Sequence, residues 1–138
     1  MKDDYEHLNH EKFKIRYHII FSTKYRKKLL GSISEDIKAY MKRAESMQNK
    51  WTIEIMEIDA VKCDHIHFLI RATPICCVAD IIHKLKQIST YDAWHNHFNY
   101  MSKWYWSGKH HLWTRGYFCS TIGDVSEKTL KEYIEKQG

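Results

Sequence analysis

The order in which strand and helix patterns follow one another constrains this chain more than any single motif. The stretch FKIRYHIIFS, residues 13–22, has an apolar residue at every second position, which is the period of a β-strand. Over the whole chain, strands are predicted at residues 13–22, 51–59, 63–72 and 112–123, and helices at residues 34–50, from 76 to the high 90s, and at 126–138. Only three residues separate the second and third strands, so these two are expected to form an antiparallel hairpin.

The resulting order, β-α-β-β-α-β and then a helix, predicts an α+β fold of the ferredoxin-like or RRM-like class. We expect an antiparallel sheet with two helices on one face, plus a C-terminal helix that carries Tyr133. The second face of the sheet is left to solvent, to a ligand or to that last helix. Ser34 and Ser126 are predicted as helix N-caps. The length predicts one domain over residues 1–138, with residues 1–12 as a flexible N-terminal segment.

Composition favours a nucleic-acid partner without proving one. The formal net charge is +5, the sequence pI is about 9.0 and aromatic residues make up 14% of the chain. Cations neutralise phosphates and aromatic rings stack on unpaired bases, although many basic proteins bind no nucleic acid. The sequence has no run of 18 apolar residues and no signal-peptide pattern, so we expect a cytoplasmic protein without a membrane span. Four cysteines without CxxC spacing are expected to be free thiols.

The stretch CDHIHFLI, residues 63–70, contains two histidines one residue apart. On a strand, alternation places His65 and His67 on one face and the apolar residues between them on the other. At about 3.3 Å per residue the two imidazoles stand roughly 7 Å apart at their roots, close enough to tilt toward one metal ion. They could equally be two surface histidines on an open sheet face, because a metal site needs at least one more ligand.

The predicted closing helix offers that further ligand. Tyr133 and Gln137 are four residues apart and therefore neighbours on one helical face. A tyrosine oxygen can act as a nucleophile, and a glutamine carbonyl oxygen is a hard ligand suited to a divalent ion. From spacing alone, the alternative is that Tyr133 packs beside apolar neighbours while Gln137 is solvated at the helix end.

Four stretches, TKYRKKLL, DHIHFLI, LWTRGYF and SEKTLKEYIEKQ, occur together and in this order. With this spacing they resemble the small single-tyrosine transposases of the IS200/IS605 insertion-sequence family, which belong to the His-hydrophobe-His (HUH) nuclease superfamily. The resemblance runs from about residue 17 to residue 137. It implies that His65, His67 and Gln137 are the metal ligands and that Tyr133 is the catalytic nucleophile of one HUH transposase domain.

The resemblance also implies the reaction and the partners. A transposase of this family cleaves and rejoins single-stranded DNA at insertion-sequence ends through a 5′-phosphotyrosine intermediate. The expected cofactor is Mg²⁺ or Mn²⁺, because the glutamine, the phosphate and waters would add oxygen ligands to the two imidazoles. The expected assembly is a homodimer that recognises DNA hairpins and in which the two subunits can share an active site.

Charge and aromatic content nominate the DNA contacts. Basic and aromatic residues in the first connection, the second helix and the loop after it are candidates: Lys24, Arg26, Lys27, Lys28, Lys84, Lys86, Trp106 and Lys109. Each could instead be a solvated cation or a packed ring. The main alternative function is a non-catalytic, RRM-like module that binds single-stranded nucleic acid. Against it, residues 63–72 carry histidines and no K/R-G-F-type stretch for base stacking. Replication or relaxase-type HUH nucleases usually need a longer chain.

Overall fold

A computed structural model describes residues 15–122, 132, 134 and 136. The elements follow the predicted order, with two short additions, η1 and α4. Their bounds are β1 Ile15–Ser22, η1 Lys24–Arg26, α2 Ser34–Ser46, β2 Trp51–Ile58, β3 His65–Ala72, α3 Val78–Asn96, α4 Phe98–Ser102 and β4 Phe118–Ile122.

The four strands form one sheet in the order β2-β3-β1-β4, and every pair is antiparallel. The two central strands, β1 and β3, pair along their whole length, from Ile15 opposite Ala72 to Ser22 opposite His65. β2 pairs with β3 as the predicted hairpin, with a register shift between Ile53 and Ile55. This confirms the α+β, ferredoxin-like prediction for the described residues.

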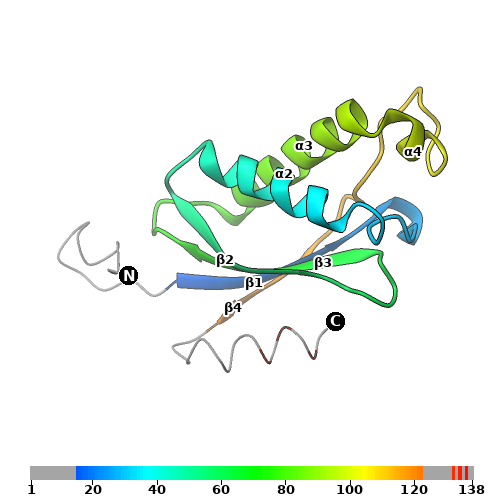
Figure 1. Ribbon diagram of the computed structural model, residues 1–138. Helices are drawn as coiled ribbons and strands as arrows, with labels where there is room; N and C mark the ends of the chain where they lie inside the picture. Colours follow the sequence, from blue (N-terminus) through cyan, green and yellow to red (C-terminus); the bar gives the residue numbers. More distant parts are fainter. Residues whose placement is uncertain (1–14, 123–131, 133, 135, 137–138) are drawn as a thin grey trace.

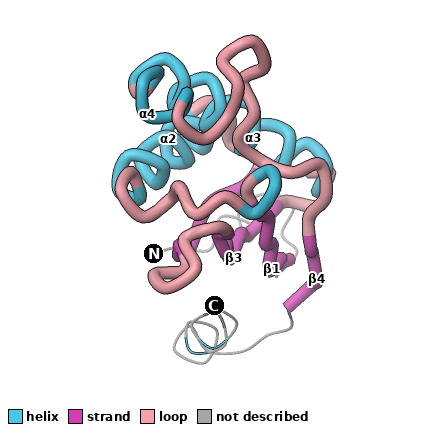
Figure 2. Tube along the Cα trace, turned by 90° about the vertical axis from the view of Figure 1, so that its right-hand side faces the viewer, coloured by secondary structure: helices cyan, strands magenta, loops and turns pink. Residues whose placement is uncertain are grey.

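Helices α2 and α3 both cover one face of the sheet, so the fold has two layers (Figure 1). The view turned by 90° shows the same separation, with the helices gathered above the strands (Figure 2). Apolar side chains from the odd-numbered positions of β1 and the even-numbered positions of β3 fill the space between the layers, among them Ile19, Phe21, Ile66 and Phe68, all at most 1% exposed. Leu85 of α3 completes this core. Burial of the core's apolar side chains is the main driving force for folding.

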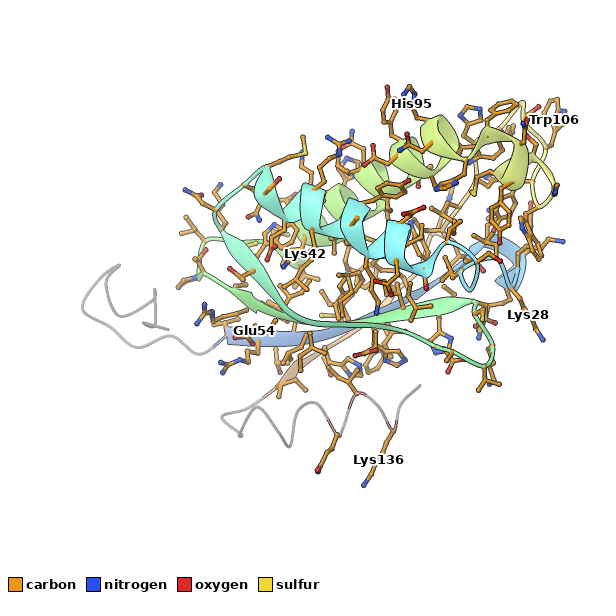
Figure 3. All side chains as sticks on the ribbon, in the orientation of Figure 1. Lys28, Lys42, Glu54, His95, Trp106 and Lys136 are labelled. Atoms are coloured by element: carbon orange, nitrogen blue, oxygen red, sulfur yellow. The ribbon has the colours of Figure 1, made fainter. Side chains whose placement is uncertain are left out.

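The opposite face of the sheet carries a second, smaller apolar cluster. Its buried members are Leu69 of β3 and Ile134, with Ile55 and Ile122 packed against them. Ile134 therefore docks on the face that α2 and α3 leave uncovered. Glu132, Ile134 and Lys136 all have helical backbone. Of these, Lys136 lies on the side of the sheet opposite the two helices (Figure 3).

Several predicted boundaries need correction. Ser34 is the first residue of α2 rather than its N-cap, because Ile33 occupies the cap position and makes no side-chain capping bond. The fourth strand begins at Phe118 and not at residue 112. Trp113 pairs with Thr23 only as an isolated bridge before the chain turns into β4. Residues 1–12 and the predicted cap Ser126 lie outside the described residues, so those predictions stay predictions.

Candidate active site

His65 and His67 lie on the central strand β3, on the face opposite the helix-covered core. Register places Ser22 and Ile20 of β1 beside them, and Glu57 of β2 on the other side of His67. The centres of the two imidazole rings are 5.0 Å apart. Both side chains are buried, with His67 only 1% exposed, so they are not the solvated surface histidines of the alternative interpretation.

A third imidazole, that of His18, belongs to the same cluster and was not predicted. Its Nε2 lies 3.2 Å from Nδ1 of His67, and the two ring planes are 15° apart with centres separated by 5.4 Å. His18 is fully buried, and Phe118 of β4 packs edge-on against it. The sequence does carry a signal, because alternation along β1 puts His18 on the face opposite Ile19. A single histidine at such a position has no motif that distinguishes it from a solvated one.

His65 is held from behind by a carboxylate. Its Nδ1 lies 2.8 Å from Oδ1 of Asp64, and Oδ2 of Asp64 accepts a hydrogen bond of 3.1 Å from Nε of Arg26. The backbone N–H of Thr23 donates to the carbonyl of Asp64, and the Thr23 hydroxyl donates to the carbonyl of Lys27. These bonds tie the basic loop, which carries Lys24, Arg26, Lys27 and Lys28, to the start of β3. A carboxylate behind a histidine is the usual arrangement that orients a metal-binding imidazole.

Burial keeps the imidazoles of His18 and His67 neutral. It lowers the pKa of His18, and burial together with the nearby rings of His65 and His18 lowers the pKa of His67 to about 4. Burial alone would raise the pKa of Asp64, but its hydrogen bonds with His65 and Arg26 bring that pKa below the ordinary value. At neutral pH the cluster thus combines neutral imidazole with an ionised carboxylate, and neutral imidazole is the form that binds metals.

The donor atoms suit a metal ion. Nε2 of His67 is buried and has no hydrogen-bond partner among the described residues. Nδ1 of His65 is committed to Asp64, which leaves its Nε2 for a ligand. Within residues 15–122, 132, 134 and 136, no group of three His, Cys, Asp or Glu side chains is arranged to hold a metal ion. The two imidazoles therefore fit part of a metal site that needs a further donor.

A cavity of about 520 Å³ opens beside His67. Residues 57–62 of the β2–β3 hairpin line it, together with His67 and Ile134. Tyr133 and Gln137 lie outside the described residues, so their predicted roles stay predictions. Their chain neighbours Ile134 and Lys136 are described, and Ile134 reaches the same cavity as the histidine.

The predicted DNA-contacting residues fall into two groups, of which the basic loop is nearer the histidines. Lys24 lies over the ring of Tyr25, and Lys28 is exposed at the end of the molecule where Trp106 also lies (Figure 3). Lys27 is half-buried. Arg26 has a positive φ of 53° and its side chain pairs with Asp64, so one cation of this loop is already part of the histidine cluster.

The other group lies on α3 and in the loop after α4. Lys84 is half-buried, whereas Trp106 and Lys109 are exposed. Lys86 donates hydrogen bonds to the carbonyls of Thr114, Arg115 and Gly116, at 2.7, 3.1 and 3.0 Å. These bonds occupy the three N–H groups of its ammonium, so Lys86 holds the approach to β4 in addition to any role toward DNA.

The arrangement of paired histidines beside Ile134 can be compared with known proteins. The sequence model of the family described as "Transposase IS200 like" matches residues 11–137. This chain belongs to that family. The ISDra2 transposase TnpA of Deinococcus radiodurans is 29% identical over 126 residues, which cover 91% of this chain and 85% of that protein. The transposase for insertion sequence element IS200 of Salmonella typhimurium is 26% identical over 135 residues, 97% of this chain and 84% of that protein.

Solved structures support the fold of this IS200-like transposase. A crystal structure described as a transposase from Deinococcus radiodurans has a TM-score of 0.71 and 24% identity, covering 99% of this chain and 98% of that one. A REP-associated tyrosine transposase bound to a REP hairpin has a TM-score of 0.60 and 9% identity, covering 91% of this chain and 67% of that one. Membership of the family makes the protein an enzyme of DNA recombination, a DNA transposase that binds DNA. No described helix has the length and apolar content needed to cross a membrane.

Proposed function

We propose that this transposase cuts and rejoins single-stranded DNA at the ends of an insertion sequence, with Tyr133 as nucleophile and His65, His67 and Gln137 as ligands of Mg²⁺ or Mn²⁺. The observation that carries the proposal is the buried Nε2 of His67, which has no hydrogen-bond partner among the described residues. It lies beside His65 on the face where Ile134, the neighbour of Tyr133 in the chain, is docked.

The protein's own groups prepare this site for a divalent ion. Asp64 fixes the ring of His65, and Arg26 keeps that carboxylate ionised and in place. Burial keeps His67 neutral, so no proton has to leave before it can act as a ligand. A divalent ion bound there supplies Lewis-acid stabilisation of the charge that develops on the scissile phosphate.

The chemical step proposed for Tyr133 exchanges one phosphate ester for another. Its phenolic oxygen attacks phosphorus and forms a new P–O bond, while the bond between phosphorus and the 3′ oxygen breaks. Phosphorus keeps its bond to the 5′ oxygen, so the 5′ end of the DNA becomes attached to tyrosine. The phenol proton is lost to water, and the leaving 3′ oxygen takes up a proton to become a hydroxyl. The covalent intermediate retains the phosphodiester energy, so a 3′-hydroxyl can attack it in reverse and rejoin the strand without ATP.

The proposed substrate is a single strand that folds into a hairpin near the element end. Support comes from the REP-associated relative, which is bound to a hairpin, and from the basic and aromatic side chains at the end of the molecule that carries Lys28 and Trp106 (Figure 3). Phosphate contacts there would position the DNA, while rings would stack on unpaired bases. We further propose a homodimer in which the segment with Tyr133 serves either its own histidine pair or that of the second subunit.

A covalent-adduct assay tests the proposal. The full-length protein is incubated with Mg²⁺ and single-stranded DNA carrying a cognate element end, and the products are separated on a denaturing gel. We expect a protein–DNA band that EDTA prevents and that Tyr133→Phe abolishes, whereas the control Tyr117→Phe, at an exposed tyrosine before β4, retains it. Salt-sensitive binding of the cognate end without any adduct would instead support a non-catalytic binding module.

A further inference from the structure

In the hydrogen bond between His18 and His67, one imidazole is the donor and the other is the acceptor. The two nitrogens are 3.2 Å apart, His18 Nε2 and His67 Nδ1, so one of them must donate a proton and the other must accept it. A neutral imidazole has one N–H and one lone pair on its two nitrogens. The direction of this bond therefore decides which nitrogen of His67 keeps a lone pair.

The proposed metal ion decides between the two directions. Either direction places a ring N–H on a buried nitrogen, Nε2 of His67 if His18 donates or Nδ1 of His18 if His67 donates, so burial does not choose between them. A metal ion binds only a nitrogen that keeps its lone pair. A ligand role for Nε2 of His67 therefore requires His67 to donate from Nδ1 to His18.

His65 shows the same arrangement with a different partner. Its Nδ1 faces the Asp64 carboxylate at 2.8 Å, and an ionised carboxylate only accepts hydrogen bonds. His65 therefore carries its proton on Nδ1 and its lone pair on Nε2. The two histidines of β3 are thus held from behind by acceptors on two different elements, Asp64 at the start of β3 and His18 on β1.

We propose that His18 is a positioning residue of this transposase: it accepts the Nδ1 proton of His67 and so presents the Nε2 lone pair of His67 to the metal ion. This inference rests on the proposed function, because the proposed metal ion is what requires a lone pair on Nε2 of His67. It assigns a role to a side chain that is fully buried and whose ring plane lies within 15° of that of His67. The hydrogen bond joins two rings that lie nearly in one plane, so it fixes both the orientation and the tautomer of the ligand ring.

The tautomer is directly measurable in the metal-free protein. Long-range ¹H–¹⁵N correlation spectra separate the two neutral tautomers of each histidine. We expect wild-type His67 to be protonated on Nδ1. His18→Gln, whose side-chain oxygen reaches about as far as Nε2, should keep that tautomer, and His18→Leu, which fills the space without an acceptor, should shift it toward the Nε2–H form. A wild-type His67 protonated on Nε2 overturns the proposal, even if no variant folds.

Metal binding tests the consequence. We expect His18→Leu to weaken Mn²⁺ binding by roughly 10- to 100-fold, the usual effect of losing a partner behind a metal ligand, as read from the EPR signal of free Mn²⁺. His18→Gln should bind Mn²⁺ nearly as the wild type does, and so should the control His83→Leu, at an exposed histidine of α3. Unchanged Mn²⁺ affinity in a folded His18→Leu protein would overturn the positioning role.

The proposed function can fail separately. If the wild-type protein cleaved DNA equally well in EDTA, the metal-dependent reaction would be refuted. The tautomer of His67 in metal-free protein would still show whether His18 sets the protonation of its neighbour.

Discussion

The two faces of the same sheet are both buried, yet they are built on opposite principles. Toward α2 and α3, β3 presents Ile66 and Phe68, which pack in a continuous apolar core. On the other face the same strand presents His65 and His67, and β1 adds His18. The first face gains stability from apolar burial throughout. The second face has a small apolar cluster around Leu69, but its histidines bear the desolvation cost of buried polar groups, which hydrogen bonds only partly offset. A cost of this kind is expected where side chains are arranged for chemistry rather than for folding.

The difference between the two faces predicts that substitutions at neighbouring residues of β3 have different effects: one at His67 should lower activity, and one at Phe68 should lower stability. His67→Ala should lower the DNA cleavage rate by roughly a thousandfold, the equivalent of about 4 kcal/mol of transition-state stabilisation. Its melting temperature should fall little or rise, because a buried polar group is removed. Single-turnover cleavage and thermal unfolding measure the two effects, with His83→Ala as the control. Loss of the fold in parallel with activity would show that the histidine face is structural.

The neighbouring change on the core face should have the reverse effect. Phe68→Ala removes a fully buried ring that contacts Phe21, and should lower the free energy of unfolding by about 3–5 kcal/mol. The folded fraction should still bind Mn²⁺ normally. Urea titration measures the loss, and the control Ile75→Ala, at an exposed side chain before α3, should change stability by no more than about 0.5 kcal/mol. Equal effects of both substitutions would contradict the assignment of the core.

A smaller effect is expected from the groups behind the ligands. Asp64→Ala leaves Nδ1 of His65 without its acceptor and should weaken Mn²⁺ binding by roughly 10- to 100-fold. Arg26→Ala should weaken Mn²⁺ binding less than Asp64→Ala does, because the Arg26 side chain is 60% exposed and acts on His65 only through Asp64. Mn²⁺ titration by EPR gives both values. Asp80→Ala, at an exposed residue in the first turn of α3, is the control. A larger loss for Arg26 than for Asp64 would refute this order.

The smallest expected effect lies outside both faces. Lys109→Ala should lower the affinity for a cognate DNA hairpin modestly and reduce the slope of log affinity against log salt by about 1, as for one lost phosphate contact. Lys42→Ala, which lies on α2 away from Lys28, should leave both unchanged (Figure 3). Binding curves at several salt concentrations measure both the affinity and its salt slope. An unchanged slope for Lys109→Ala would remove this residue from the DNA surface.

Local periodicity predicts most of the fold but only part of the site. Alternation along β3 is sufficient to place His65 and His67 on one face, and the predicted topology is sufficient to pair β1 with β3. His18 was missed because its role depends on that pairing and not on a motif of its own. The three backbone carbonyls bound by Lys86 could not have been predicted, because they come from a loop 28–30 residues away. Helical spacing singles out Tyr133 and Gln137, but only the family resemblance gives them roles, and those roles remain predictions.

The central claim is that the histidine face is an active centre completed by Tyr133. The most direct test is to digest the covalent protein–DNA adduct and locate the attached nucleotide by mass spectrometry. We predict attachment through a 5′-phosphate to Tyr133, formed only with Mg²⁺ or Mn²⁺ present and lost in His67→Ala. Attachment to another residue, or an equal yield of adduct in EDTA, would contradict the claim.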